Sequence, residues 1–259
     1  MIRYEPFDWY DEPLYYDIIF DVDTAREAEF LEGVMERYGT GGRRVLEPAC
    51  GSGRLVGAMA ARGYHVTGFD LNAAALRFAR RRLRDAGLRA RFGKASMAGF
   101  DFGCRFDAAH CLVSTFKYLL DAKSARRNLE CVAAALKPGG AYVLGLHLSE
   151  YGTTVRARER WIAARDGVTV TCNLQVWPPD RHRRTERVRC RLIVEGDGPT
   201  RHLETNWQFR TYDLRQVRSL LKSVRDLEHV ATFHFDCDLD RPTPFDGEWL
   251  DNVLVLRKK

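Results

Sequence analysis

The sequence predicts an α/β fold in which a parallel sheet, with helices on both faces, is interrupted by an antiparallel β insertion. Between residues 43 and 148, strand-like and helix-like segments alternate, which is the pattern of a parallel sheet. Turn-rich sequences then separate three β-like segments at 168–177, 186–194 and 202–210, as in an antiparallel meander. We therefore expect a seven-stranded sheet whose last strand is antiparallel, carrying a separate β insertion.

The elements follow from local patterns. Residues 1–23 are rich in aromatic side chains but too polar for a strand, so we expect an arm that folds over another part of the chain. Thr24 and Glu27 have the spacing of a capping box and predict a helix start at Thr24, and glycines at 39–42 end that helix. Helices are then expected at 54–62, 72–85, 124–136 and 213–224, and sheet strands at 43–47, 64–70, 88–92, 106–112, 141–148, 227–235 and 252–257.

The composition is that of a soluble globular protein, with 45% hydrophobic and 29% charged residues in a chain of 259. No apolar run approaches the roughly 18–20 residues that a membrane span needs, and we see no signal peptide. The seven cysteines are scattered and form no C-x-x-C pair. This pattern favours reduced thiols and a cytoplasmic location.

The formal net charge is +6, and most of it lies in the expected insertion, where residues 151–210 hold twelve arginines against seven acidic residues. Such a surface attracts anionic substrates or nucleic acid. Nucleic-acid-binding proteins usually concentrate the charge in one stripe, whereas here it is spread over a sheet. We therefore favour a solvated sheet face and expect no nucleic-acid partner.

The most informative segment is 45–55, which reads as a buried strand, an acid, a glycine-rich turn and a helix start. Gly51 and Gly53 allow a tight turn and a close approach of a ligand to the backbone, and the helix start offers free N–H groups. A dinucleotide site requires a third glycine where Val56 stands, and a phosphate-binding loop requires G-K-[ST], which is missing. The turn alone indicates only a nucleotide-like ligand.

Three motifs in order resemble those of the class I S-adenosylmethionine-dependent methyltransferases, of the metal-independent type that modifies small molecules. The first is 47–53, Glu-Pro-Ala-Cys-Gly-Ser-Gly, in which Ala49 replaces a family glycine. The second is the acid Asp70 after a strand, and the third is Leu-Lys-Pro-Gly-Gly at 136–140. The resemblance implies a Rossmann-like sheet and the cofactor S-adenosylmethionine, with no metal.

The resemblance also implies how the cofactor is bound. Glu47 suits the cationic methionine end, Asp70 the ribose hydroxyls, Leu71 the adenine face, Ser96 and Met97 the adenine edge, and the carbonyl of Cys111 the ammonium group. The thiol of Cys111 is either a nucleophile or a buried structural thiol, and the structural role is favoured. The expected cofactor residues are Glu47, Ala49, Cys50, Gly51, Gly53, Asp70, Leu71, Ser96, Met97 and Cys111.

Candidate catalytic and acceptor residues lie outside these motifs. His147 ends a strand where open α/β sheets bind ligands, and it is either a base or substrate contact or a structural histidine. Tyr16, and Tyr15 beside it, would close over the cofactor from the arm. Further candidates for acceptor contact are Tyr118, Arg210, and His234 with its neighbour Asp236.

These expectations divide the chain into four units and suggest one function. We expect an arm and capping helix at 1–39, a cofactor-binding core at 40–149, a β insertion covering the substrate at 150–210, and completion of the sheet at 211–259. The expected function is methyl transfer from S-adenosylmethionine to nitrogen or oxygen of a small-molecule acceptor, expected to be anionic, by alignment and direct displacement. RNA or protein methylation through the basic insertion, and cofactor binding without catalysis, remain open alternatives.

Overall fold

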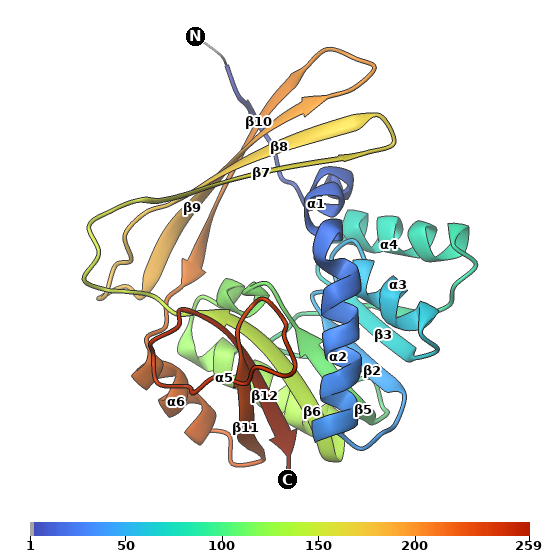
Figure 1. The fold of residues 1–259 in the computed structure, drawn as a ribbon, viewed down its shortest axis with the longest axis vertical. Coiled ribbons are helices and arrows are strands. Elements are labelled where there is room, and N and C mark those ends of the chain that lie inside the picture. Colours follow the sequence, from blue (N-terminus) through green and yellow to red (C-terminus); the bar gives the residue numbers. More distant parts are fainter. Residues whose placement is uncertain (1–2) are drawn as a thin grey trace.

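A computed structural model describes residues 3–259, which form two sheets joined end to end (Figure 1). The larger sheet has the order β11-β12-β6-β5-β2-β3-β4. All its neighbouring pairs are parallel except those of β12, which runs antiparallel to both β6 and β11. The predicted fold class is confirmed. Its strands are β2 (Arg44–Pro48), β3 (His65–Asp70), β4 (Arg91–Lys94), β5 (Phe106–Cys111), β6 (Leu136–His147), β11 (Leu227–Phe233) and β12 (Asp251–Lys258).

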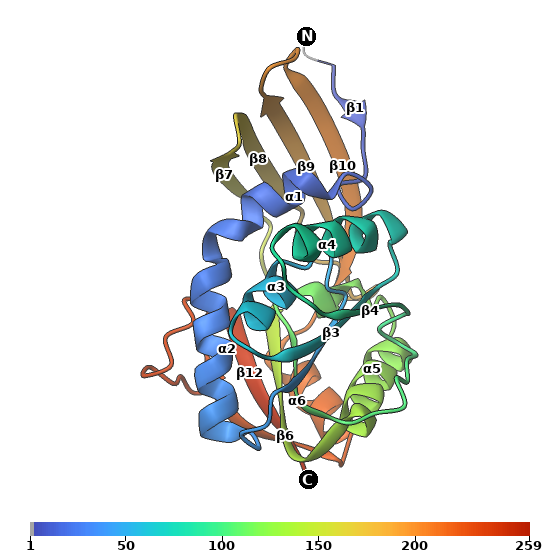
Figure 2. The ribbon, with the colours of Figure 1, turned by 90° about the vertical axis from the view of Figure 1, so that its right-hand side faces the viewer.

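Helices cover both faces of this sheet, because its central strands are apolar on both sides (Figure 2). Every residue of β5 is buried. On one face α2 and α3 pack through Phe30, Leu31 and Met59, and on the other α5 packs through Leu129 and Val132. The covering helices are α2 (Thr24–Tyr38), α3 (Arg54–Ala61), α4 (Ala73–Asp85), α5 (Ala122–Ala135) and α6 (Leu214–Lys222). None of the helices in residues 3–259 is long and apolar enough to cross a membrane.

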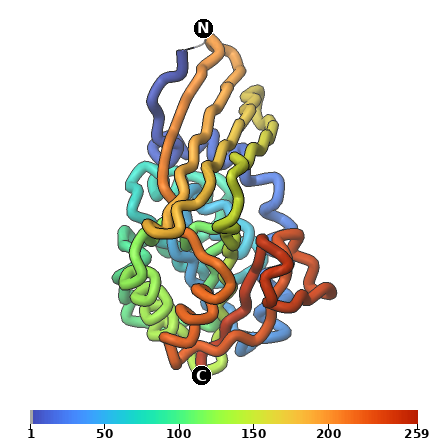
Figure 3. Tube along the Cα trace, turned by 90° about the vertical axis from the view of Figure 1, so that its left-hand side faces the viewer, coloured from blue at the N-terminus to red at the C-terminus, as the bar shows by residue number. Residues whose placement is uncertain are grey.

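The insertion forms a second sheet of order β1-β10-β9-β8-β7. Three of its strands match the predicted meander, whereas β7 is additional and the expectation that the N-terminal arm is too polar for a strand is wrong. Glu5–Pro6 pairs with Leu203 and Glu204 at the sheet edge, where side chains stay exposed and proline is tolerated. Figure 3 shows this arm beside the insertion. The strands are β1 (Glu5–Pro6), β7 (Ala157–Arg165), β8 (Val168–Val176), β9 (Thr185–Glu195) and β10 (Arg201–Arg210).

The start of α2 differs from the predicted capping box. The chain enters α2 directly from α1 (Pro13–Phe20) and the turn η1 (Asp21–Asp23), so Thr24 is already helical and caps nothing. Its hydroxyl donates to Asp21 and accepts from Arg54, and Glu27 pairs with the buried Arg54 instead of with the backbone. A tertiary ion pair has replaced the local cap because Arg54 would otherwise be buried without a partner.

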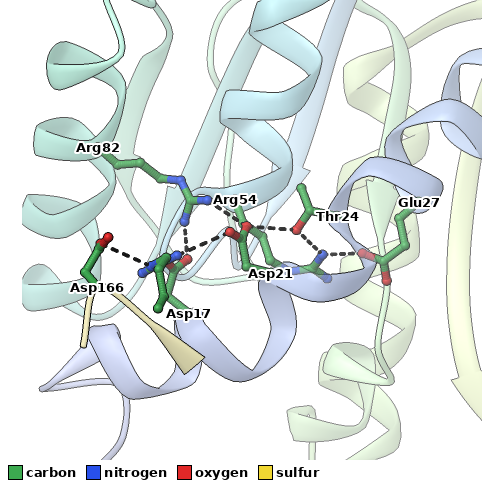
Figure 4. Close-up of polar contacts among 8 residues, drawn as sticks. Asp17, Asp21, Thr24, Glu27, Arg54, Arg82 and Asp166 are labelled. Carbon is green, nitrogen blue, oxygen red and sulfur yellow. Dashed lines mark hydrogen bonds and ion pairs between the residues drawn. The ribbon is translucent and has the colours of Figure 1, made fainter. Parts of the chain in front are cut away.

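A buried carboxylate joins the arm to both sheets (Figure 4). Asp17 on α1 is 1% exposed and accepts from Arg82 of α4 and, at 2.6 Å, from Arg165 of β7. Asp21 accepts from the same two arginines, at 2.7 and 3.2 Å. Two carboxylates and two guanidiniums therefore link α1, α4 and the insertion. We call these four residues the Asp17 cluster.

Asp17→Asn should destabilise the protein by about 2 kcal/mol, because it removes a buried carboxylate charge and leaves Asp21 alone to pair with the partly exposed Arg82 and Arg165. Chemical denaturation measures this change in the free energy of unfolding. The control is Asp23→Asn, which removes a half-exposed ion pair with Arg26 and should cost no more than about 0.5 kcal/mol. Equal effects of the two substitutions would show that the cluster does not stabilise the fold.

Candidate active site

The glycine-rich turn between β2 and α3 is held in left-handed backbone conformations. Ala49, Gly51 and Gly53 have φ values of 53°, 52° and 72°. A Cβ on Gly53 would lie 2.8 Å from the Cβ of Ala79, so only glycine allows α3 and α4 to approach. Ala49 adopts the same left-handed conformation although it carries a Cβ, so glycine would be the less strained residue there.

Asp70, at the end of β3, faces this turn. Its Oδ2 accepts from the backbone N–H of Gly51 at 2.9 Å, and its Oδ1 accepts from that of Asn72 at 2.8 Å. Asn72 in turn caps α4 by accepting from the N–H groups of Ala74 and Ala75. Burial raises the pKa of Asp70. Each carboxylate oxygen retains a lone pair, so the group can still accept from a bound hydroxyl.

A cleft runs beside the turn and brings several of the predicted residues together. Glu47, Ala49, Cys50 and Cys111 line it, and Tyr16 reaches it from α1. The Tyr16 ring would lie 3.7 Å from a Cβ on Gly51, which places the ring against the turn. Arg54 and Thr115, which the sequence reasoning missed, line the cleft as well.

Glu47 is the buried acid of this cleft. It is 7% exposed, and its Oε2 has no hydrogen-bond partner among residues 3–259. Burial raises its pKa to about 8, although the neighbouring Arg54 acts in the opposite direction. The nearest ring nitrogen of His110 lies 4.0 Å away, and burial lowers the pKa of His110 to about 3. Glu47 therefore has an oxygen available to a cationic ligand and no protonated histidine beside it.

The predicted adenine-contacting residues lie along the ends of β3 and β4. Leu71 is 62% exposed, an unusual position for a large apolar side chain directly after Asp70. Ser96 accepts from the N–H of Ala98 at 3.2 Å, and the Met97 carbonyl accepts from Asn128 at 2.9 Å. These three residues together offer an apolar surface and a hydroxyl.

Cys111 ends β5 at a strained part of the chain. Burial raises the pKa of its thiol to about 12, so the thiol stays protonated near neutral pH. Val113 and Ser114 follow in left-handed conformations, at φ 54° and 58°. The Ser114 hydroxyl accepts from the backbone N–H of His147 at 3.0 Å, which ties this turn to the end of β6. Strained non-glycine residues of this kind are common at functional sites.

His147 forms a pair with Asp251 that the sequence reasoning missed. The Nδ1 of His147 lies 2.6 Å from Oδ1 of Asp251, and the two residues are directly opposite in the register of β6 and β12. This hydrogen bond leaves Nε2 as the free ring nitrogen. His147 keeps the pKa of Asp251 low, although burial acts in the opposite direction. No local sequence pattern indicates this pair, because the residues are 104 positions apart and meet only through the register of the last strand.

The remaining candidates lie outside the residues that line the cleft. The Tyr15 hydroxyl accepts from Arg201 of the insertion at 3.2 Å, and the Tyr118 and Tyr10 hydroxyls lie 2.6 Å apart within an aromatic cluster. Arg210 donates to the carbonyl of Leu120, and His234 stacks against Trp249. His147 does not line the cleft either. The roles of these residues stay predictions.

A second cavity, of about 270 Å³, adjoins the cleft and shares Leu112 and Val113 with it. Phe20 and Glu27 line it from the arm and α2, and Phe235 and Cys237 line it from the segment after β11. It therefore offers a mainly apolar space next to the cleft, bounded by segments from three distant parts of the sequence.

Comparison with known proteins identifies a methyltransferase domain in this chain and structures that share its fold. Residues 45–140 match the family model described as "Methyltransferase domain". DesVI of Streptomyces venezuelae superposes with a TM-score of 0.77 at 19% identity, over 98% of this chain and 100% of its own. The family model thus places a methyltransferase domain at residues 45–140, and the superposition shows that the chain shares the fold of DesVI.

Particular relatives are small-molecule methyltransferases by name. The ubiquinone biosynthesis O-methyltransferase of Aromatoleum aromaticum is 31% identical over 134 residues, which are 51% of this chain and 54% of that protein. The dTDP-3-amino-3,6-dideoxy-alpha-D-glucopyranose N,N-dimethyltransferase of Streptomyces fradiae is 29% identical over 186 residues, 71% of this chain and 70% of its own. The chain spans about half the length of the first curated relatives it matches.

The buried acid Glu47 should make stability depend on pH. Its pKa is raised from 4.5 to about 8 in the folded protein, so folding favours the protonated form and stability declines as the pH rises from about 4.5 to 8. Glu47→Gln stays neutral and should remove this decline, raising the melting temperature at pH 8 and changing it little at pH 5. Thermal unfolding at several pH values measures it.

The control for Glu47→Gln is Glu248→Gln, which removes an exposed carboxylate and should leave the pH dependence of the wild type unchanged. A Glu47→Gln profile that parallels the wild-type profile between pH 5 and 8 would contradict the assignment of that dependence to Glu47.

Proposed function

We propose that this protein transfers a methyl group from S-adenosylmethionine to a nitrogen or oxygen atom of a small molecule. The observation that carries the proposal is the buried Oε2 of Glu47, which has no hydrogen-bond partner in the described chain and faces a cleft formed by the glycine-rich turn. A buried acceptor without a donor is costly unless a ligand supplies one. A primary ammonium group is a donor of the right charge.

The chain's residues fit the rest of this cofactor. Asp70 would accept from ribose hydroxyls with the lone pairs that Gly51 and Asn72 leave free. Leu71 and Met97 would pack on the adenine ring, with the Ser96 hydroxyl at its edge. When bound, S-adenosylmethionine supplies an electrophilic methyl group on a cationic sulfur. The residues around it need only orient the acceptor and exclude water.

Tyr16 and the second cavity would perform these two tasks. Tyr16 packs on Phe20 with ring centroids 4.6 Å apart, and this aromatic pair covers the cleft from the arm. Burial raises the pKa of Tyr16 to about 12, so its hydroxyl remains a proton donor near neutral pH. The cavity beside Leu112 and Val113 would hold the acceptor, and its volume is near the lower end of that of small-molecule pockets.

His147 lies outside the lining of both cavities, two residues beyond Gly145 of the second one on β6, and is proposed as the base that would take a proton from the acceptor at Nε2. Asp251 orients the ring through Nδ1. Glu159 of β7 adds negative charge near Asp251. Burial raises the pKa of Glu159, and the charge of Asp251 raises it further. The insertion thus reaches the neighbourhood of the dyad, whose side chains remain 42% and 39% exposed.

The acceptor's charge and the protein's location are finer proposals. The Streptomyces fradiae relative acts, by its name, on a dTDP-linked amino sugar, which supports an anionic acceptor. The names of the relatives reported above do not support RNA or protein as the acceptor. All seven cysteines are free, which is consistent with the proposed cytoplasmic location.

Asp70→Ala should weaken binding of S-adenosylhomocysteine about 100-fold, because it removes two charge-assisted hydrogen bonds to the ribose. Isothermal titration calorimetry measures the affinity, and circular dichroism checks that the variant folds. The control is Asp101→Ala, which removes an exposed carboxylate away from the cleft. An unchanged affinity in Asp70→Ala, or no binding by the wild type, would refute the proposed cofactor site.

His147→Gln should lower kcat about 100-fold with little change in KM, because the base is lost. Asp251→Asn should lower kcat less, because the ring stays in place but loses the hydrogen bond that orients it. Release of S-adenosylhomocysteine with a panel of amino-sugar and phenolic acceptors measures the rates. His182→Gln, at an exposed turn of the insertion, is the matched control. A kcat within twofold of the wild type would exclude His147 as the base.

A further inference from the structure

A third cavity, larger than the second cavity described above, lies away from the cleft and is lined by arginines. It has a volume of about 520 Å³ and lies where α5 and α6 meet the segments 181–184 and 210–213 that border β9 and β10 (Figure 1). Arg126, Arg181, Arg184, Arg210 and Arg215 line it. The methyl-transfer mechanism proposed above uses none of them.

Two of these guanidiniums have a buried Nε without a partner in the described chain, one on the buried Arg210 and one on the half-buried Arg184. Arg210 is 7% exposed; one of its terminal nitrogens donates to the Leu120 carbonyl at 2.8 Å, but its Nε has no partner among residues 3–259. Arg184 donates to the Thr211 carbonyl at 3.1 Å, and its buried Nε likewise has no partner in the described chain. Buried donors are normally satisfied, so these two indicate an acceptor from outside the chain.

Tyr212 supplies a third such donor between them. It is 2% exposed, and its hydroxyl has no hydrogen-bond partner within residues 3–259. The guanidinium carbons of Arg184 and Arg210 lie 5.3 and 5.6 Å from the centre of its ring. The ring therefore keeps the two arginines in fixed positions beside the cavity.

The charges around the cavity are unbalanced. Arg181, Arg184 and Arg210 form no salt bridge in the described part of the chain, whereas Arg126 pairs with Glu130 at 2.8 Å. The acid that lines the cavity is Asp213, which already accepts from the Gln216 N–H as the cap of α6 and lies 4.0 Å from Arg215. The first turns of α5 and α6 also border the cavity and favour negative charge there.

We propose that this arginine cavity binds the phosphate group of a phosphate-bearing ligand. Several guanidiniums and a hydroxyl offer more donors than the two oxygens of one carboxylate can accept, whereas a phosphate presents three strong acceptor oxygens and up to two charges. The volume accommodates a diphosphate with an attached organic group. This site is separate from the cofactor cleft and does not depend on the proposed methyl transfer.

Calorimetric titration of the full-length protein with inorganic phosphate, pyrophosphate and adenosine diphosphate tests the proposal. Saturable binding of one phosphate-bearing ligand per chain is expected, with pyrophosphate tighter than phosphate because it carries more charge. Arg184→Gln should weaken pyrophosphate binding at least tenfold. The matched control is Arg183→Gln on the same turn, which removes an equal charge from a side chain that is 84% exposed and does not line the cavity; it should change the affinity less than twofold.

No saturable binding of any of the three probes by the wild type would overturn the proposal, as would equal losses in Arg183→Gln and Arg184→Gln, since these indicate attraction by net charge alone. Arg181→Gln, at an exposed lining residue, provides a second variant if Arg184→Gln does not fold. Equal affinity for pyrophosphate and adenosine diphosphate identifies the phosphates alone as the ligand, whereas tighter binding of the nucleotide identifies a larger phosphorylated molecule. Because S-adenosylhomocysteine carries no phosphate, its titration reports independently on the cofactor cleft.

Discussion

The burial of Asp17 constrains the arm, the core and the insertion at the same time. A carboxylate that is 1% exposed needs compensating charge, and the cluster supplies it from α4 through Arg82 and from β7 through Arg165. Tyr16 is the next residue on α1, so the same ion pairs that fix Asp17 hold the Tyr16 ring against the glycine-rich turn. The position of the Tyr16 ring at the cleft therefore depends on electrostatic contacts made by a neighbouring residue on the same helix.

A second buried charge arrangement sets the state of the cleft itself. Arg54 pairs with Glu27 and is held by Thr24, so its charge is largely compensated before Glu47 is considered. Glu47 is then a buried acid with no donor on Oε2, and its raised pKa means that it holds a proton over much of the neutral range. A cationic ligand would favour the carboxylate. We therefore expect ligand binding below about pH 8 to release a proton from Glu47.

The core fold could be predicted from sequence because its signals are local, and the residues proposed to bind the cofactor follow the same strands. The turn at 49–53, Asp70 and the capping residue Asn72 all follow the strands that place them. The failures involve residues that are close in space only. Thr24 has the spacing of a helix cap, yet its hydroxyl accepts a hydrogen bond from Arg54, and Glu27 forms an ion pair with the same arginine. Glu5 and Pro6 form a strand because they pair with an edge strand of the insertion.

The acceptor half of the site has no comparable local signal. Its cavity is bounded by Phe20 from the arm, Val113 after β5 and Phe235 after β11, and its candidate base is oriented by a residue 104 positions away. Substitutions at these separate positions can alter the cavity without disturbing the glycine-rich turn. The names of two relatives differ in the same respect, since one refers to ubiquinone biosynthesis and the other to a dTDP-linked amino sugar. Under the proposed function, acceptor choice would therefore depend on the contacts between the arm, the strand ends and the insertion rather than on the motifs.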